Sequence, residues 1–171
     1  YGNLLSIAWT GARNGEDVNL RHALSAYPRL PVFCKNAGSG DHSMATNAAK
    51  TIRAPHENVE VMLLDGRMGQ LPLSPGNPNV GILYRGGKDA LDSESFESRL
   101  AVVNKLAEKL GLPLGVDVSH GSSVAHAGKK SAEGQRQALK HTLSMAAGHL
   151  ITLKALWVEA YLLEGADTSG K

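Results

Sequence analysis

The sequence predicts one α/β domain in which helices cover a parallel sheet, and three observations favour this. Strand-like runs alternate along the chain with segments of helical spacing, and strands joined through helices pair in parallel. The 171 residues, of which 42% are hydrophobic, suffice for one domain with a substantial core. One connection has no room for a helix and carries turn signals, which predicts a β-hairpin beside the sheet.

The predicted elements follow in order along the chain. Six runs have strand character: 6–12, 30–35, 59–65, 80–86, 114–119 and 155–162. Four segments between them have helical spacing: 16–26, 41–52, 94–111 and 131–149. Asp41 is expected to cap the second helix, and Gly111 is expected to end the third. The helix-free connection contains the short run 71–73, which we expect to be the extra strand of the hairpin.

Composition narrows the classes of function. The net charge is only +2, and the 18 basic residues form no stripe along the chain, which argues against nucleic-acid binding. No apolar run approaches the ~18 residues of a membrane span, and no charged-then-apolar leader is recognisable. Cys34 is the single cysteine, as is typical of a reducing compartment. We therefore expect a cytoplasmic protein that binds neither nucleic acid nor membranes.

Ionisable residues stand at or near the carboxyl ends of five strand-like runs, where parallel α/β proteins bind ligands. They are Arg13, Lys35, Arg85, His120 and Glu159. Three neighbouring cations in otherwise apolar files are costly to bury without an anion, and a phosphate suits Arg and Lys donors best. His and Glu are both ligands of divalent transition metals. Each residue taken alone also has a plainer explanation, as a solvated turn, a rim lysine or a strand-end histidine.

Strand parity sharpens this prediction, because side chains two positions apart share a face of a strand. By this rule Lys35 continues the file of Phe33, Arg85 that of Leu83, and Glu159 that of Trp157. The same rule places His120 with Val116 and Val118. Asp117 then has the opposite parity, and we expect it to face the helices in a structural role. Cys34 is expected to be a packed hydrophobic residue.

Five ordered motifs resemble the class I 3-deoxy-D-arabino-heptulosonate 7-phosphate (DAHP) synthases. They are WTGAR (9–13), PVFCKN (31–36), NVGILYRGGK (79–88), GVDVSHGSS (115–123) and WVEAYLLEG (157–165). The similarity runs from about residue 6 to about residue 165. Such enzymes are metal-dependent transferases with a TIM barrel. They condense phosphoenolpyruvate with erythrose 4-phosphate in the first step of the shikimate pathway, which leads to the aromatic amino acids.

The resemblance implies a role for each residue at the strand ends. Arg13, Lys35 and Arg85 match the cations that hold the phosphoenolpyruvate phosphate. His120 and Glu159 match metal ligands, and the ion is Mn, Fe, Co or Zn, between which the sequence does not distinguish. Lys35 and His120 are the residues expected to act in catalysis.

The resemblance also departs from the family pattern. It begins at about the fourth barrel strand, which implies a partial (β/α)8 barrel in residues 1–165 and a flexible tail in residues 166–171. The family's metal cysteine, carboxylate-binding arginine and Lys-Pro-Arg-Thr type segment have no counterpart here. The metal aspartate is not placed, since Asp167 comes too early, and Ala160-Tyr161 replaces a Ser-His pair. The chain is therefore expected to be incomplete alone and to form a homo-oligomer or associate with the missing part of the barrel.

Three functions remain open from the sequence. We favour the carboxyl-terminal portion of a DAHP-synthase-like enzyme. The second is a shortened family member that binds a phosphorylated ligand without catalysis. The third is a related synthase that uses a different aldose phosphate, such as an arabinose phosphate, because the aldose-binding segment is absent.

Overall fold

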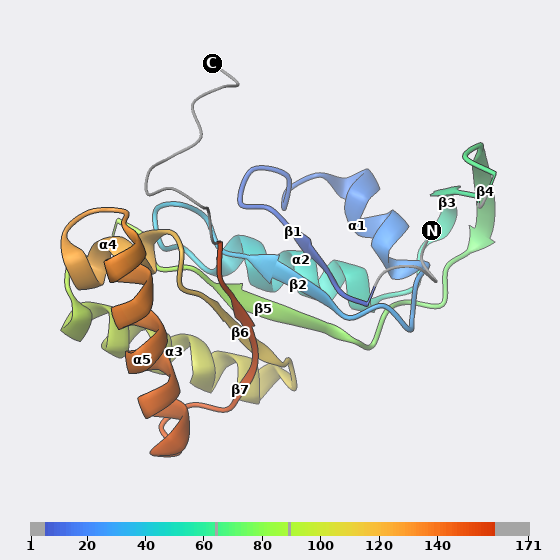
Figure 1. Cartoon of the computed structure of the whole chain (residues 1–171). Coiled ribbons are helices and arrows are strands. Elements are labelled where there is room, and N and C mark those ends of the chain that lie inside the picture. Colours follow the sequence, from blue (N-terminus) through green and yellow to red (C-terminus); the bar gives the residue numbers. More distant parts are fainter. Residues whose placement is uncertain (1–5, 64, 89, 160–171) are drawn as a thin grey trace, which may run out of the picture.

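The computed structural model describes residues 6–63, 65–88 and 90–159, and its centre is a parallel sheet of five strands (Figure 1). The strand order is β1-β2-β5-β6-β7. The bounds are β1 (Ala8–Thr10), β2 (Val32–Lys35), β5 (Val80–Tyr84), β6 (Leu114–Asp117) and β7 (Leu153–Trp157). This parallel order confirms the predicted α/β class and is the arrangement of a partial (β/α)8 barrel.

In the described part of the chain, five helices connect and flank these strands. They are α1 (Val18–Ser25), α2 (Ser43–Arg53), α3 (Ser93–Leu110), α4 (Gly121–Ala127) and α5 (Ala132–Ala147). Helix α3 begins with a capping box between Asp92 and Ser95, and it ends at Gly111 in the left-handed conformation, as predicted. The N-cap of α2 is His42 instead of Asp41, although Asp41 still accepts a hydrogen bond from the Ser43 N–H. Helix α4 was not predicted.

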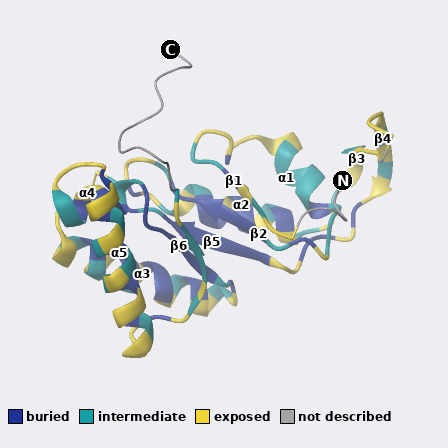
Figure 2. Cartoon of the chain, in the orientation of Figure 1, coloured by how far each residue is buried: buried dark blue, intermediate teal, exposed yellow. Residues whose placement is uncertain are grey.

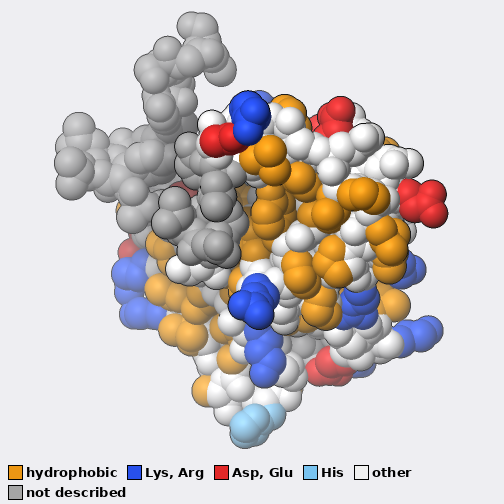
Figure 3. Space-filling model, turned by 90° about the vertical axis from the view of Figure 1, so that its right-hand side faces the viewer, with side chains coloured by type: hydrophobic (Ala, Val, Ile, Leu, Met, Phe, Trp, Pro, Cys, Tyr) orange, Lys and Arg blue, Asp and Glu red, His pale blue; other side chains and the backbone are white. Residues whose placement is uncertain are grey.

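The helix-free connection forms a separate two-stranded hairpin, as predicted. Strands β3 (Glu57–Met62) and β4 (Met68–Leu73) pair in antiparallel register, with Val59 opposite Leu71. The run at 59–65 therefore belongs to the hairpin and not to the main sheet. Figure 3 views the side of the molecule on which this hairpin lies and shows hydrophobic side chains at its surface. On the hairpin itself, Met62, Leu63, Met68 and Leu73 are exposed.

The core lies between one face of the sheet and the helices, and the central strands are almost wholly buried (Figure 2). Alternate strand residues such as Val32, Ile82 and Val116 pack in one cluster with helix residues such as Ile52 and Phe96. Cys34 belongs to this cluster, as expected of a packed hydrophobic residue. Successive side chains on a strand point to opposite faces of the sheet, so the residues between these core positions lie on the other face.

The other face of the sheet carries a cluster of three aromatic side chains. The ring centroid of Trp157 lies 5.6 Å from that of Trp9 and 5.4 Å from that of Phe33. A Cβ added at Gly81 would stand 2.8 Å from the Phe33 ring, so the glycine makes room for this ring. Trp9 is 51% exposed although it stands on a strand of the sheet. This face is therefore apolar and incompletely covered.

Two further points concern the chain as a whole. Within the described part of the chain, no helix combines the length and hydropathy that crossing a membrane requires. The predicted tail at 166–171 and the end of the last predicted strand run fall outside the described residues, as do Asp167 and the pair at 160–161.

Candidate functional site

A buried ion pair occupies the carboxyl end of the sheet. Lys35 is the last residue of β2 and Asp117 the last residue of β6, and the Lys35 Nζ lies 2.7 Å from the Asp117 Oδ2. Both side chains are buried. A buried charge is tolerated only where it is paired and hydrogen-bonded, so each of these two groups depends on the other.

His120 and Glu159 adjoin this pair. The Nδ1 of His120 lies 2.9 Å from the Asp117 Oδ2, and its Nε2 lies 3.5 Å from the Glu159 Oε1. The same Glu159 oxygen lies 3.7 Å from the Lys35 Nζ. The structure therefore brings together three of the residues singled out in the sequence, and Asp117 contacts two of them, Lys35 and His120.

The expectation that Asp117 faces the helices is wrong. Val116 and Val118 pack in the core against the helices, whereas Asp117 reaches the face that carries Lys35. Strand β6 ends at Asp117, and His120 stands at the N-cap of α4, so strand parity does not extend to His120. In the sheet, Gly115 pairs with Leu83, which places Asp117, two residues further on, level with Arg85.

The charge of Asp117 is fixed by its surroundings. Burial raises the pKa of this carboxyl, but the hydrogen bonds from His120 and Lys35 lower it more, to about 2. The Ser119 backbone N–H also donates to the Asp117 Oδ1, at 2.9 Å. Asp117 is therefore an anion at neutral pH, surrounded by donors.

Arg85 follows β5 and is held through its backbone. Its N–H donates to the Asn36 Oδ1 at 2.8 Å, and its carbonyl accepts from the Ser122 N–H at 3.0 Å. The side-chain Nε is buried and finds no hydrogen-bond partner among the described residues. Burial lowers the pKa of Arg85, while attraction to Asp117 and Glu159 opposes that shift. A buried donor without a partner, close to a cluster of charges, suits an incoming anion.

Arg13 is the most peripheral of the five predicted residues. It is exposed on the loop after β1, and its positive charge contributes to lowering the pKa of Arg85, so the two guanidinium groups influence each other. Like charges in proximity are unfavourable unless an anion joins them. The structure thus places Arg13 and Arg85 at the same end of the sheet, close enough for their charges to interact.

Glycines allow the loops at this end to pack backbone against backbone. Gly86 has φ +68°, and a Cβ there would lie 2.6 Å from the Ser122 backbone nitrogen. A Cβ on Gly121 would lie 2.6 Å from the Gly87 nitrogen. The Arg-Gly-Gly-Lys motif is therefore explained by close approach to the loop that carries His120 as well as by turn formation.

Sequence reasoning missed two further residues of the site. The Ser119 Oγ accepts a hydrogen bond from the Glu159 N–H at 2.6 Å and so joins the ends of β6 and β7. The Lys130 Nζ lies 3.9 Å from the Glu159 Oε2. Ser119 is part of the quoted GVDVSHGSS motif, so its small polar side chain was available as a signal. Lys130 lies in the loop between α4 and α5, and no feature of the sequence pointed to it.

Among the described residues, Asp117, His120 and Glu159 form a group that could hold a metal ion, with ligand atoms within 4.8 Å of one another. The 3.5 Å between the His120 Nε2 and the Glu159 Oε1 is close to the ~3–3.4 Å between two ligands that each stand ~2.1 Å from one ion. Nitrogen and carboxylate donors also suit a first-row transition metal. The residues present therefore fit a divalent ion.

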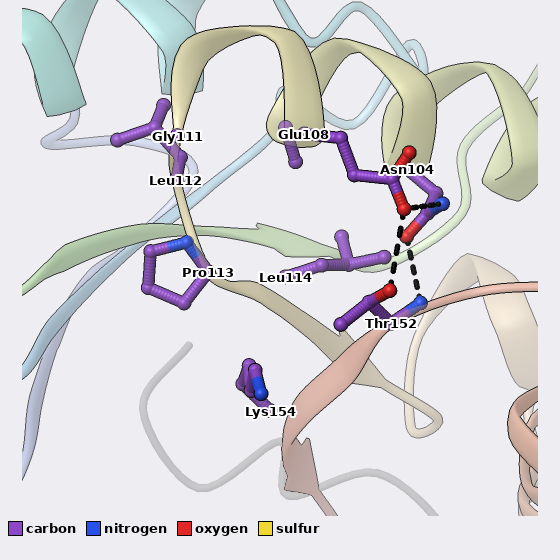
Figure 4. A pocket seen from close by; sticks show the side chains of 9 residues that line it. Asn104, Glu108, Gly111, Leu112, Pro113, Leu114, Thr152 and Lys154 are labelled. Carbon is purple, nitrogen blue, oxygen red and sulfur yellow. Dashed lines mark hydrogen bonds between the residues drawn. The ribbon is translucent and has the colours of Figure 1, made fainter.

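A cavity of about 230 Å³ lies at the opposite end of the sheet, between the end of α3 and the beginnings of β6 and β7 (Figure 4). Its polar groups bond to each other. The Asn104 Oδ1 accepts from the Thr152 N–H at 2.9 Å, and the Asn104 Nδ2 donates to the Glu108 Oε1 at 2.9 Å. This network fastens α3 to β7, as expected for the amino-terminal end of barrel strands, where conserved contacts serve stability.

Comparisons with known proteins identify the fold and the family of the chain. A solved structure titled phospho-2-dehydro-3-deoxyheptonate aldolase, from Francisella tularensis SCHU S4, superposes with a TM-score of 0.77 at 22% sequence identity. The match covers 100% of this chain but 48% of the other, so the chain spans about half the length of that protein. No curated protein sequence matches the chain. The model of the DAHP synthetase I family matches residues 1–170. The chain therefore belongs to the DAHP synthetase I family.

Proposed function

We propose that this chain forms the metal- and phosphate-binding portion of a DAHP synthase, which condenses phosphoenolpyruvate with erythrose 4-phosphate. The observation that carries the proposal is the convergence of Lys35, His120 and Glu159, with Arg85 beside them, at the carboxyl ends of the strands. Family membership supports this reaction. Because the chain spans about half the length of its structural neighbour, we assign the activity to the complete barrel.

The anion site consists of Arg13, Lys35 and Arg85, which bind the phosphate of phosphoenolpyruvate. The unpartnered Nε of Arg85 supports this assignment, because a phosphate oxygen would supply the acceptor it lacks. Lys35 is paired with Asp117 and is also 3.7 Å from Glu159, so its ammonium is the cation of the anion site that adjoins the metal-binding groups. In that position Lys35 orients phosphoenolpyruvate so that its C3 faces the second substrate.

His120 and Glu159 are the residues of this chain that hold the divalent ion, which is Mn, Fe, Co or Zn. When bound, the ion supplies a Lewis acid that polarises the aldehyde carbonyl of the aldose phosphate. The chain's own contribution is to fix both donors. Ser119 anchors the backbone of Glu159, and Asp117 accepts from the Nδ1 of His120.

The uncovered apolar face of the sheet requires a partner that covers it. Trp9 is half exposed on β1, and β1 and β7 are edge strands of a parallel sheet. Parallel sheets occur almost only with both faces covered, and open edges invite pairing. We propose that further barrel strands cover this face, and self-association of the chain is the alternative.

The single cysteine, Cys34, is buried and free, which supports a cytoplasmic setting.

The test is release of inorganic phosphate by the chain combined with the segment that completes the barrel. We expect release only with phosphoenolpyruvate, erythrose 4-phosphate and Mn²⁺ together. Arg85→Ala should raise the KM for phosphoenolpyruvate at least tenfold, because a charge-assisted contact to phosphate is worth ~1.5–3 kcal/mol. Arg136→Ala, an exposed arginine on α5, is the matched control and should leave this KM unchanged.

Calorimetry of phosphoenolpyruvate binding, together with the turnover assay, distinguishes the alternative functions. Phosphoenolpyruvate binding without turnover would favour a family member that binds a phosphorylated ligand without catalysis. Turnover with an arabinose phosphate in place of erythrose 4-phosphate would favour the related synthase. An unchanged KM in the Arg85 variant would remove that residue from the anion site.

A further inference from the structure

We propose that Asp117 is the positioning residue of this site, which fixes the orientation and tautomer of His120 while it holds Lys35, and that it is not itself a metal ligand. The inference rests on the proposed function, because it takes His120 as a ligand of the divalent ion. It separates one member of the three-residue group from the other two.

The hydrogen bonds of Asp117 leave little room for a metal. Its Oδ1 accepts from the Ser119 N–H at 2.9 Å. Its Oδ2 lies 2.7 Å from the Lys35 Nζ and 2.9 Å from the His120 Nδ1. A carboxylate oxygen has about two lone-pair sites, so both sites of Oδ2 are in use. A metal ion bound to the Oδ2 of Asp117 would have to displace a buried ammonium or the histidine.

The same contacts determine which nitrogen of His120 is free. An ionised carboxylate only accepts hydrogen bonds, so the Nδ1 that faces Asp117 carries the hydrogen. In the neutral ring the Nε2 is then the nitrogen without a hydrogen, and it faces the Glu159 Oε1 at 3.5 Å. Histidines that bind metals usually donate the other ring N–H to a carboxylate or carbonyl in this way. Asp117 therefore prepares His120 for a metal held jointly with Glu159.

Asp117 is itself held rigidly, which a positioning residue requires. It is fully buried, and its carbonyl accepts from the Ser122 Oγ at 2.7 Å. Glu159, by contrast, is partly exposed and lies farther from Lys35, at 3.7 Å. When Glu159 serves a metal, Asp117 is the carboxylate that remains as the counter-ion of Lys35. One buried group thus aligns the anion-binding and metal-binding sides of the site.

The tautomer of His120 tests this inference without any metal. Two-dimensional ¹⁵N spectra of the metal-free chain should show His120 as the Nδ1–H tautomer, with its signals identified by their loss in His120→Gln. In Asp117→Asn, an amide that accepts from Ser119 turns its NH₂ toward His120, which should shift the ring to the Nε2–H tautomer. Glu159→Gln is the matched control and should leave the tautomer unchanged. A wild-type His120 in the Nε2–H form, or one that Asp117→Asn does not alter, would overturn the proposal.

Metal affinity gives the second readout, through a double-mutant cycle with Lys35. We expect Asp117→Asn to weaken Mn²⁺ binding about 10–100-fold, as other losses of an outer-shell partner do. The loss should be similar in a Lys35→Met background, where no buried ammonium is left unpaired if Asp117 is replaced. If Asp117 serves only as the counter-ion of Lys35, its replacement in that background would leave Mn²⁺ affinity unchanged.

The two readouts also separate this inference from the proposed function. A wild-type chain, combined with the barrel-completing segment, that binds no Mn²⁺ would contradict the proposed metal site. The tautomer result would still decide whether Asp117 orients His120. Lys35→Met/Asp117→Asn removes both buried charges, so it provides a folded comparison if Asp117→Asn alone does not fold.

Discussion

Acid should destabilise the chain through Asp117, and the size of the effect follows from its pKa. The carboxyl has a pKa of about 2 in the folded protein, against 3.8 for an ordinary aspartate. Between these values the unfolded chain binds more protons than the folded chain, so the free energy of unfolding increases with pH. The contribution is fully present above about pH 4 and is lost as the pH falls through 2. At ~1.4 kcal/mol for each pKa unit, it amounts to about 2 kcal/mol.

The measurement is urea unfolding of the metal-free chain at a series of pH values between 2 and 7. We expect the difference in unfolding free energy between wild type and Asp117→Asn to shrink by about 2 kcal/mol as the pH falls from 5 to 2. Glu133→Gln is the control. Arg136 lowers the pKa of Glu133 to about 2 as well, but this pair is exposed and screened by salt. The Glu133 contribution should disappear in 1 M salt, whereas that of Asp117 should persist. A difference between wild type and Asp117→Asn that does not vary with pH would refute the reasoning.

Other substitutions test the packing around the site. Gly86→Ala should destabilise the chain by more than Gly111→Ala, since both glycines have positive φ but only Gly86 faces backbone within 3 Å. Urea midpoints compare them, and we expect about 1 kcal/mol for Gly111 and at least twice that for Gly86. Asn104→Ala should cost about 1 kcal/mol, because it removes the acceptor of the Thr152 N–H. Equal effects at the two glycines, or a neutral Asn104 variant, would contradict these contacts.

The approach of the site residues could be predicted because it follows from topology. Strands joined through helices run parallel, so their carboxyl ends meet at one edge, and Lys35 and Glu159 were expected there. The 3.7 Å between them agrees with that reasoning. The prediction needed only the order of elements and the residue types at their ends, and both can be read from the sequence.

The orientation of Asp117 could not be predicted in the same way. The parity rule was applied through His120, but the strand ends at Asp117 and the chain turns before α4. The end of a strand depends on hydrogen bonds to neighbouring strands, and the sequence does not display these. Helix α4 was missed for a related reason. It has seven residues and opens with glycine and two serines, which read as a loop.

The contact between Gly86 and Ser122 has a mechanical consequence. The backbone of the loop after β5 touches the backbone at the start of α4, with no side chain between them to absorb movement. A displacement of Arg85 by an arriving ligand is therefore transmitted directly to the segment that carries His120. We therefore expect the loop after β5 and the start of α4 to move together, so that a change on one side of the site has a cost on the other.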